Sequence, residues 1–226
     1  MCLGCQDPKH KDHVCGQSSL REEIFCHLPY AIFSVSLGLI ILSLLSYANG
    51  QGTVLGAHRL FHSLHYLHLI FSATGAILMF RKYSQNFVLS LLVGTAVPAV
   101  FCTLSDAILP YFGGRLAGLD MHFHWCFVQH LPTVLPFLVI GMLNGWVISS
   151  HFASSQIFYS TGSHFLHIFV SSMASIMYLV SFGFSSWGEH MGFVFLFLLF
   201  AVLVPCTLSD IVVPLLFARK AQVGRK

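Results

Sequence analysis

Residues 102–110 read Cys-Thr-Leu-Ser-Asp-Ala-Ile-Leu-Pro, and residues 206–214 read Cys-Thr-Leu-Ser-Asp-Ile-Val-Val-Pro. The first five residues are identical, and each stretch has a proline four positions after its Asp. The chain has only eight acidic residues, yet Asp106 and Asp210 both lie inside long apolar runs. The repeat therefore predicts an internal duplication in which each half keeps an ionisable group where such a group is costly.

The composition indicates a membrane protein. Of the 226 residues, 56% are hydrophobic and only 8% are charged, whereas a soluble domain carries about 25% charged residues. Apolar runs of roughly 20 residues recur along the chain, which is typical of transmembrane helices. The strict alternation expected of membrane β-strands is absent, so we predict an all-α polytopic bundle. A net charge of +3 is too small to suggest nucleic acid as a partner.

We expect six transmembrane helices arranged as two three-helix repeats. The predicted spans cover residues 23–48, 59–80, 87–112, 125–148, 163–182 and 192–217. The corresponding organisation is a Cys/His-containing tail (1–21), repeat one (22–112), an outer loop (113–124), repeat two (125–217) and a basic tail (218–226).

The basic residues predict the orientation in the membrane. Six spans place both termini on one side, and cytoplasmic loops carry an excess of Lys and Arg. Only Arg59 and Arg115 fall on the opposite side, and the remaining basic residues lie with the termini: Lys9, Lys11, Arg21, Arg81, Lys82, Arg219, Lys220, Arg225 and Lys226. Both termini are therefore predicted to be cytoplasmic, or on the matrix or stromal side in an organelle.

Histidine motifs extend the duplication. His-Leu-Pro begins at His27 in the first span and at His130 in the fourth. His164 and His167 in the fifth span match either His62 and His65 or His65 and His68 in the second. Repeats with an odd number of spans must insert with opposite orientations, which is the inverted-repeat plan of many transporters.

Depths estimated at about 1.5 Å of rise per residue predict two polar clusters near opposite faces. The outer cluster contains His65, His68 (or His62), Asp106 and His130. The inner cluster contains His27, His164, His167 and Asp210. In this arrangement each cluster takes its His-Leu-Pro histidine from the other half of the chain. Cys102 and Cys206 lie one helical turn before the two aspartates and share their faces.

These residue types suit a transition-metal ion. Imidazole and carboxylate groups from separate helices form a ligand set for Zn²⁺ or Fe²⁺, and each Asp either ligates the ion or orients a histidine. The N-terminal tail adds further candidate ligands that could receive or deliver an ion: Cys2, Cys5, His10, His13 and Cys15.

The favoured function is a transporter or permease for a divalent transition metal, with histidine protonation coupling metal binding to protons. A second interpretation is an electron-transfer subunit that would carry electrons across the membrane, with a quinone as a candidate acceptor. It would hold two b-type haems, one between His65 or His68 and His130, the other between His27 and His164 or His167. Further alternatives are an intramembrane metal-dependent hydrolase, a structural subunit of a membrane complex, and a thiol relay through Cys102 and Cys206. No catalytic residue is assigned, so a non-enzymatic role is favoured.

Overall fold

The computed structural model describes residues 20–49, 53–151, 156–183 and 187–223, and these residues form helices and connecting loops without a strand. The predicted tail ligands Cys2, Cys5, His10, His13 and Cys15 lie outside the described residues. The elements are α1 (Leu20–Asn49), α2 (Thr53–Tyr83), α3 (Phe87–Thr103), η3 (Leu104–Ile108), α4 (Leu109–Leu116), α5 (Cys126–Gln129), α6 (Leu131–His151), α7 (Gln156–Ser181), η5 (Trp187–His190), α8 (Met191–Thr207), η6 (Leu208–Val212) and α9 (Val213–Val223).

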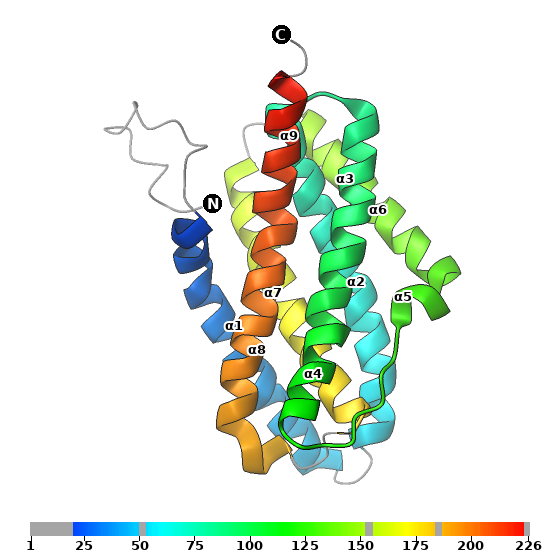
Figure 1. Cartoon of the computed structure of the whole chain (residues 1–226), viewed down its shortest axis with the longest axis vertical. Helices are drawn as coiled ribbons and strands as arrows, with labels where there is room; N and C mark the ends of the chain where they lie inside the picture. Colours follow the sequence, from blue (N-terminus) through cyan, green and yellow to red (C-terminus); the bar gives the residue numbers. More distant parts are fainter. Residues whose placement is uncertain (1–19, 50–52, 152–155, 184–186, 224–226) are drawn as a thin grey trace.

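Six of the resulting helical segments are long and apolar enough to cross a membrane, which confirms the predicted all-helical fold and matches the six expected helices in number. Consecutive long helical segments run in alternating directions, so α1 begins and α9 ends at the same end of the bundle (Figure 1). We call this the terminal end. The opposite end, where the connection from α4 to α5 passes beneath the helices, is called the loop end.

The bundle has a polar interior and an apolar exterior. Four histidines (His27, His65, His68 and His167), both aspartates of the repeated segments and several serines are buried. Large apolar side chains such as Leu44, Phe200 and Leu92 face outward instead. Because a soluble protein shows the reverse distribution, this pattern is the one expected of a bundle surrounded by lipid.

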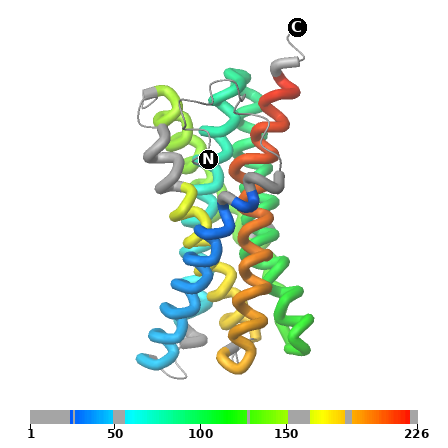
Figure 2. The backbone as a smooth tube through the Cα atoms, turned by 90° about the vertical axis from the view of Figure 1, so that its left-hand side faces the viewer, coloured from blue at the N-terminus to red at the C-terminus, as the bar shows by residue number. Residues whose placement is uncertain are grey.

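The central pair of helices is α2 and α7, which pack against each other along much of their length. α1 packs mainly against α7 and α8 of the second half, whereas α6 packs against α2 and α3 of the first half. Figure 2 shows α1 beside α8, although the two are far apart in sequence. Each half therefore takes its first helix from the other half, as the sequence predicts.

The two Cys-Thr-Leu-Ser-Asp segments fold in the same way. In each, Cys and Thr end an α-helix, and Leu-Ser-Asp begin a π-helical segment, η3 or η6. The N–H groups of Leu109 and Val213 donate to the carbonyl groups five residues earlier, at Leu104 and Leu208. Pro110 and Pro214 cannot donate to the carbonyl groups of Asp106 and Asp210, so the proline explains why the α-helical register is interrupted here.

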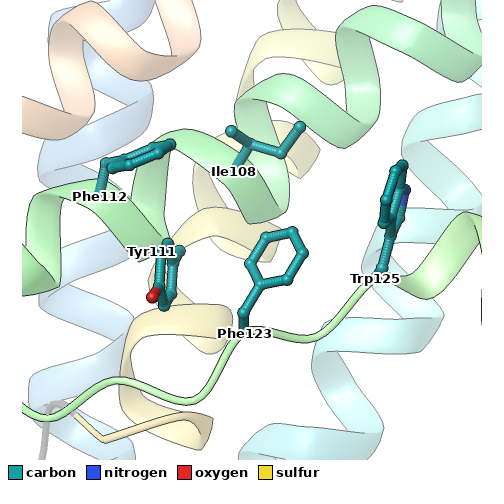
Figure 3. A pocket seen from close by; sticks show the side chains of 5 residues that line it. All are labelled: Ile108, Tyr111, Phe112, Phe123 and Trp125. Carbon is teal, nitrogen blue, oxygen red and sulfur yellow. The ribbon is translucent and has the colours of Figure 1, made fainter.

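A shallow apolar hollow of about 330 Å³ lies on the surface beside η3. Its walls are Ile108, Tyr111, Phe112, Phe123 and Trp125, which come from η3, α4 and the following loop (Figure 3). Tyr and Trp at the end of a membrane bundle are typical of the lipid–water interface, so the hollow is consistent with a bilayer-facing surface.

Close helix packing at Gly141 gives a first testable prediction. A Cβ atom at Gly141 in α6 would lie 2.6 Å from the carbonyl oxygen of Ile70 and 2.8 Å from Cβ of Ala73 in α2. Small residues allow membrane helices to approach closely, and overpacking such a contact costs about 1–3 kcal/mol. We expect Gly141→Ala to lower the midpoint of thermal unfolding in detergent micelles.

The matched control is Gly56→Ala in α2, where an added Cβ meets nothing within 4 Å. This replacement should leave the midpoint unchanged or raise it slightly, because Ala favours helix more than Gly. Equal midpoints for the two variants would contradict the close approach of α6 to α2.

Candidate metal site

Asp106 is held by four polar side chains. Its Oδ2 atom lies 2.9 Å from Nδ1 of His65 and 2.7 Å from Nδ1 of His68, one helical turn apart on α2. The hydroxyl groups of Ser105 and Ser171 donate to Oδ1 over 2.7 and 2.9 Å. All four acceptor directions of the carboxylate are thus occupied by donors, in a completely buried environment,.

Asp210 has the same relation to the second His-x-x-His pair but fewer hydrogen bonds. Its Oδ2 atom accepts a hydrogen bond from Nδ1 of His164 at 3.1 Å. Nδ1 of His167 also lies 3.1 Å from this oxygen, but the geometry is too poor for a hydrogen bond. Oδ1 of Asp210 has no hydrogen-bond partner among the described residues. The second half therefore has an unsatisfied counterpart of the Asp106 site.

Two histidines and two thiols converge at the centre of the bundle. Nε2 of His68 lies 3.0 Å from Nε2 of His167. The Sγ atoms of Cys102 and Cys206 lie 3.7 and 3.8 Å from the same nitrogen of His68. All four side chains are buried. The candidate ligand atoms of His68, His167 and Cys206 lie within 4.8 Å of one another. We refer to these four residues as the central site.

The spacing of the central site fits a tetrahedral ion. With Zn–N bonds near 2.0 Å and Zn–S bonds near 2.3 Å, two nitrogen ligands should lie about 3.3 Å apart, and a nitrogen and a sulfur about 3.6 Å apart. The corresponding distances here are 3.0 Å and 3.7–3.8 Å. His68, His167 and Cys206 form the group whose ligand atoms all lie within 4.8 Å of one another, and Cys102 adjoins it through His68. Cysteine and histidine together are a common zinc ligand set.

Asp106 explains why Nε2 of His68 is suited to bind a cation. A carboxylate only accepts hydrogen bonds, so Nδ1 of His68 must carry the hydrogen that it shares with Asp106. A neutral His68 then presents a lone pair at Nε2. Nδ1 of His167 makes no hydrogen bond with Asp210, and Nε2 of His167 donates to the lone pair of His68 at 3.0 Å. A metal ion that displaced this shared hydrogen would be bound by both nitrogens, and carboxylates such as Asp106 commonly orient metal-binding histidines in this way.

The structure resolves which histidines of the two halves correspond. His65 and His164 each contact an aspartate through Nδ1, as do His68 and His167. By these contacts His65 resembles His164 and His68 resembles His167, whereas His62 contacts His124 and Cys126. The same spacing also pairs Ser72 with Ser171, the serine that donates to Asp106. Ser72 instead forms a 2.6 Å hydrogen bond with Ser209 in η6.

The two clusters predicted near opposite faces meet in the structure. The inner group assembles as expected, since His164 and His167 contact Asp210 and the ring of His27 lies 4.2 Å from that of His164. The hydrogen bond between His68 and His167 then joins it to the Asp106 group. The reason is that α7 begins at Gln156, seven residues before the predicted span, so His167 lies near the middle of the helix.

His130 lies elsewhere than predicted. The helix breaks between α5 and α6, and His130 occupies the break with φ −124° and ψ 30°. Its ring contacts those of His62 and His124 at centroid distances of 5.2 and 5.7 Å, toward the loop end. Its counterpart His27 lies in the continuous helix α1 and contacts His164. The helix break accounts for this asymmetry between the two His-Leu-Pro motifs.

Sequence reasoning missed two kinds of residue. Ser105 and Ser171 complete the hydrogen bonds of Asp106. The signal for Ser105 is its place in the repeated Cys-Thr-Leu-Ser-Asp stretch, and the signal for Ser171 is the spacing after a His-x-x-His pair that it shares with Ser72. His124 and Cys126 contact His62 only because a loop folds back over α2, and no periodic pattern marks that contact. None of the family models, curated proteins or solved structures compared with the chain matches it.

Proposed function

We propose that this chain is a membrane transporter for a divalent transition-metal ion, with Zn²⁺ as the best-fitting substrate. The observation that carries the proposal is the central site: two imidazole nitrogens 3.0 Å apart and two thiols within 3.8 Å of one of them. Thiolate and imidazole together favour Zn²⁺, whereas Fe²⁺, the other candidate, is typically held by two histidines and one carboxylate.

The location of the central site supports transport rather than a structural role for the ion. His68, His167, Cys102 and Cys206 each have 2% or less of their surface exposed, so an ion bound there is closed off from both ends of the bundle. Polar residues continue from it toward both ends, to His65 in one direction and to His164 and His27 in the other. An occluded site between two related halves is the arrangement that alternating access requires.

The duplicated segments supply a mechanism for opening the site. We infer an inverted repeat, with its pseudo-two-fold axis near the contact between His68 and His167. The π-helical segments η3 and η6 carry the two aspartates, and each is followed by a proline. π-Helical segments often occur at functional sites, and movement at either one would shift Asp106 or Asp210 relative to the histidines. Metal binding to thiols releases protons, which would couple ion movement to protons.

The distribution of charge supports a cytoplasmic terminal end. Arg81 and Lys82 lie in the last turn of α2, and Lys220 lies in the last turn of α9. Both helices finish at the terminal end (Figure 1). Arg115 lies near the loop end, where it pairs with Asp120 at 3.2 Å. The positive-inside rule then assigns the terminal end to the cytoplasmic side.

The arrangement of the histidines favours a compact ion over a pair of haems. The rings of His27 and His164 have centroids only 4.2 Å apart, which leaves no space for a porphyrin between them. His130, expected to share a haem with His65 or His68, contacts His62 and His124. An absorption spectrum of the purified protein tests this point, and a Soret band with sharp reduced α bands would replace the transport proposal with electron transfer.

The transport proposal is tested in proteoliposomes that contain a zinc-sensitive dye. We expect zinc entry above that of protein-free liposomes, and an initial rate at least about tenfold lower for the double variant Cys102→Ser/Cys206→Ser. Even groups that only orient a metal ligand change affinity by about 10- to 100-fold, so losing two thiol ligands should have at least this effect.

The matched control is Thr103→Ser/Thr207→Ser. These threonines adjoin the cysteines, but their hydroxyl groups donate to carbonyl groups of their own helices, at Ala99 and Leu203. This variant should transport zinc at the wild-type rate. Zinc entry that is equal to protein-free liposomes, or unaffected by loss of the two thiols, would contradict the proposal.

A further inference from the structure

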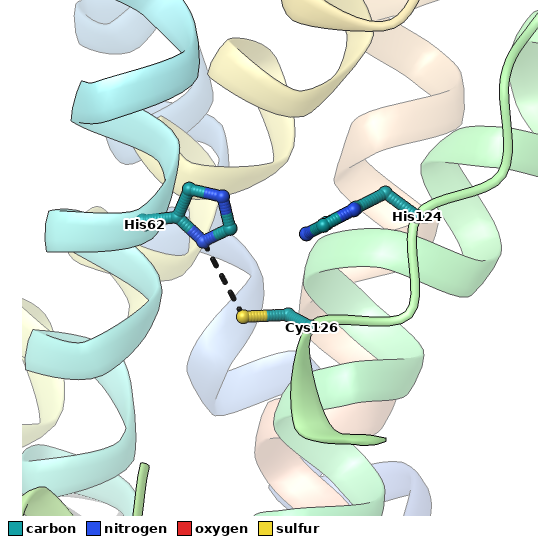
Figure 4. A group of neighbouring side chains, drawn as sticks. All are labelled: His62, His124 and Cys126. Carbon is teal, nitrogen blue, oxygen red and sulfur yellow. Dashed lines mark hydrogen bonds between the residues drawn. The ribbon is translucent and has the colours of Figure 1, made fainter. Parts of the chain in front are cut away.

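A second group of metal-ligating side chains lies near the loop end, outside the central site. His62 in α2, His124 in the loop and Cys126 at the start of α5 place their ligand atoms within 4.8 Å of one another. Figure 4 shows the three side chains converging from α2 and the loop. Nδ1 of His62 lies 3.4 Å from Sγ of Cys126, close to the roughly 3.6 Å expected between a nitrogen and a sulfur ligand of zinc.

The loop that carries His124 is fixed to the bundle. The N–H group of His122 donates to the carbonyl oxygen of Phe182, and the N–H group of His124 donates to the hydroxyl of Tyr178, at 3.0 and 3.1 Å. The Tyr178 hydroxyl donates in turn to the carbonyl oxygen of His122 at 3.4 Å. The imidazole of His124 is therefore held against His62 by backbone contacts.

One atom of the group is left unsatisfied in a way that points to a ligand. Nε2 of His124 is buried and has no hydrogen-bond partner among the described residues. Burial, together with the neighbouring His130 and His58, lowers the pKa of His124, so its imidazole is neutral near pH 7.

We propose that His62, His124 and Cys126 form a second binding site for a divalent transition-metal ion of the zinc class. Half-buried His130 contacts both histidines and is the nearest candidate for a fourth ligand. The thiol and imidazole donors set the metal class here as they do in the central site. We call these three residues the loop site.

The position of the loop site indicates what it does. On α2, His58, His62, His65 and His68 follow one another at intervals of four, three and three residues, so they form a stripe along one face of the helix,. The stripe begins at exposed His58, passes the loop site and ends at the central site. The loop site is therefore an intermediate stop between the loop end and the central site; this role, unlike binding itself, rests on the proposed transport function.

The binding claim is tested by counting zinc ions on the full-length chain in detergent. The tail cysteines are first replaced (Cys2→Ser, Cys5→Ser and Cys15→Ser), so that the tail contributes no thiol ligand. The protein is stripped with a chelator, dialysed against zinc and analysed by elemental mass spectrometry. We expect Cys126→Ser and His62→Ala each to lose one equivalent of zinc relative to this parent protein. His124→Ala provides a third variant should either fail to fold.

The control is His122→Gln, at an exposed loop residue that is hydrogen-bonded through its backbone to Tyr178 in α7 and to Phe182 just after α7. It should bind as much zinc as the parent protein. Titration with Co²⁺ adds an optical measurement, because the thiolate-to-cobalt band should weaken in Cys126→Ser. It should weaken independently in Cys102→Ser/Cys206→Ser, which reports on the central site.

Unchanged zinc content in folded Cys126→Ser and His62→Ala would overturn the loop site. The outcome for transport is separate. If zinc binds at both sites but does not enter proteoliposomes, the loop site stands as a binding site and the transport proposal fails. If zinc enters proteoliposomes while the loop variants retain all their zinc, the transport proposal stands and the loop site fails.

Discussion

Asp106→Ala should lower the free energy of unfolding by about 3–5 kcal/mol, the cost of leaving one partner of a buried ionic network unpaired. The reason is the number of donors that depend on this carboxylate. His65, His68, Ser105 and Ser171 all contact its two oxygens at 2.7–2.9 Å. Removal of Asp106 leaves Nδ1 of His65 and of His68 without an acceptor in a buried site, and unpaired buried donors are costly. Ser105 and Ser171 keep only longer hydrogen bonds, to the carbonyl oxygen of Cys102 at 3.2 Å and to the hydroxyl of Ser105 at 3.3 Å.

The duplication provides the control, Asp210→Ala. Asp210 occupies the corresponding position in η6 but accepts one hydrogen bond, from His164. Its removal should cost only about 1–3 kcal/mol. The measurement is the midpoint of thermal unfolding of the full chain in detergent, with a chelator present so that loss of bound metal does not contribute. Equal destabilisation by the two variants would show that the hydrogen bonds to Asp106 do not carry its stability.

Much of the fold could be predicted because apolar runs and short motifs recur along the sequence. The apolar runs predict six spans, and the structure has six helices of sufficient length. The alternation of directions, together with the separate His-Leu-Pro motifs, predicts that each half borrows its first helix from the other, and α1 and α6 pack in this way. The proximity of Cys102 and Asp106 also follows from helical spacing, since both contact the imidazole of His68.

What could not be predicted depends on where helices begin, bend and break. A shift of seven residues in the start of α7 brings His167 to the centre of the bundle and merges two predicted clusters into one. The break between α5 and α6 removes His130 from the Asp106 group. Depth estimated from span limits is therefore less reliable than the repeat itself.

The π-helical segments η3 and η6 could not be predicted from the sequence either, although their cause can be recognised in it. The prolines four residues after Asp106 and Asp210 are visible in the sequence and remove one backbone donor each,. A proline alone is equally compatible with a simple bend, and the widened turn is evident only from the bonds that Leu109 and Val213 make to carbonyl groups five residues earlier. The matching geometry of η3 and η6 shows that both copies of the segment respond to the proline in the same way.

His68→Ala should abolish metal binding at the central site, and this is the largest effect on binding that we expect. Nε2 of His68 is the atom on which the site converges, 3.0 Å from Nε2 of His167 and 3.7–3.8 Å from the two thiols. Without this nitrogen, the other candidate ligand atoms lack the one atom that lies close to all of them. We expect the zinc affinity of the central site to fall by at least about 10³-fold, beyond the roughly 10- to 100-fold effect of groups that only orient a ligand.

His65→Ala is the matched control, because His65 lies one turn away on the same helix, is equally buried and contacts the same oxygen of Asp106. Its Nε2 atom has no hydrogen-bond partner among the described residues and is not part of the central site. Its loss removes one partner of Asp106 but no central ligand, so affinity should fall only about 10- to 100-fold. Competition with a chelator of known zinc affinity measures both values on chains with Cys126→Ser. Equal losses would mean that His68 acts through Asp106, as His65 does, and that its Nε2 atom is not a ligand.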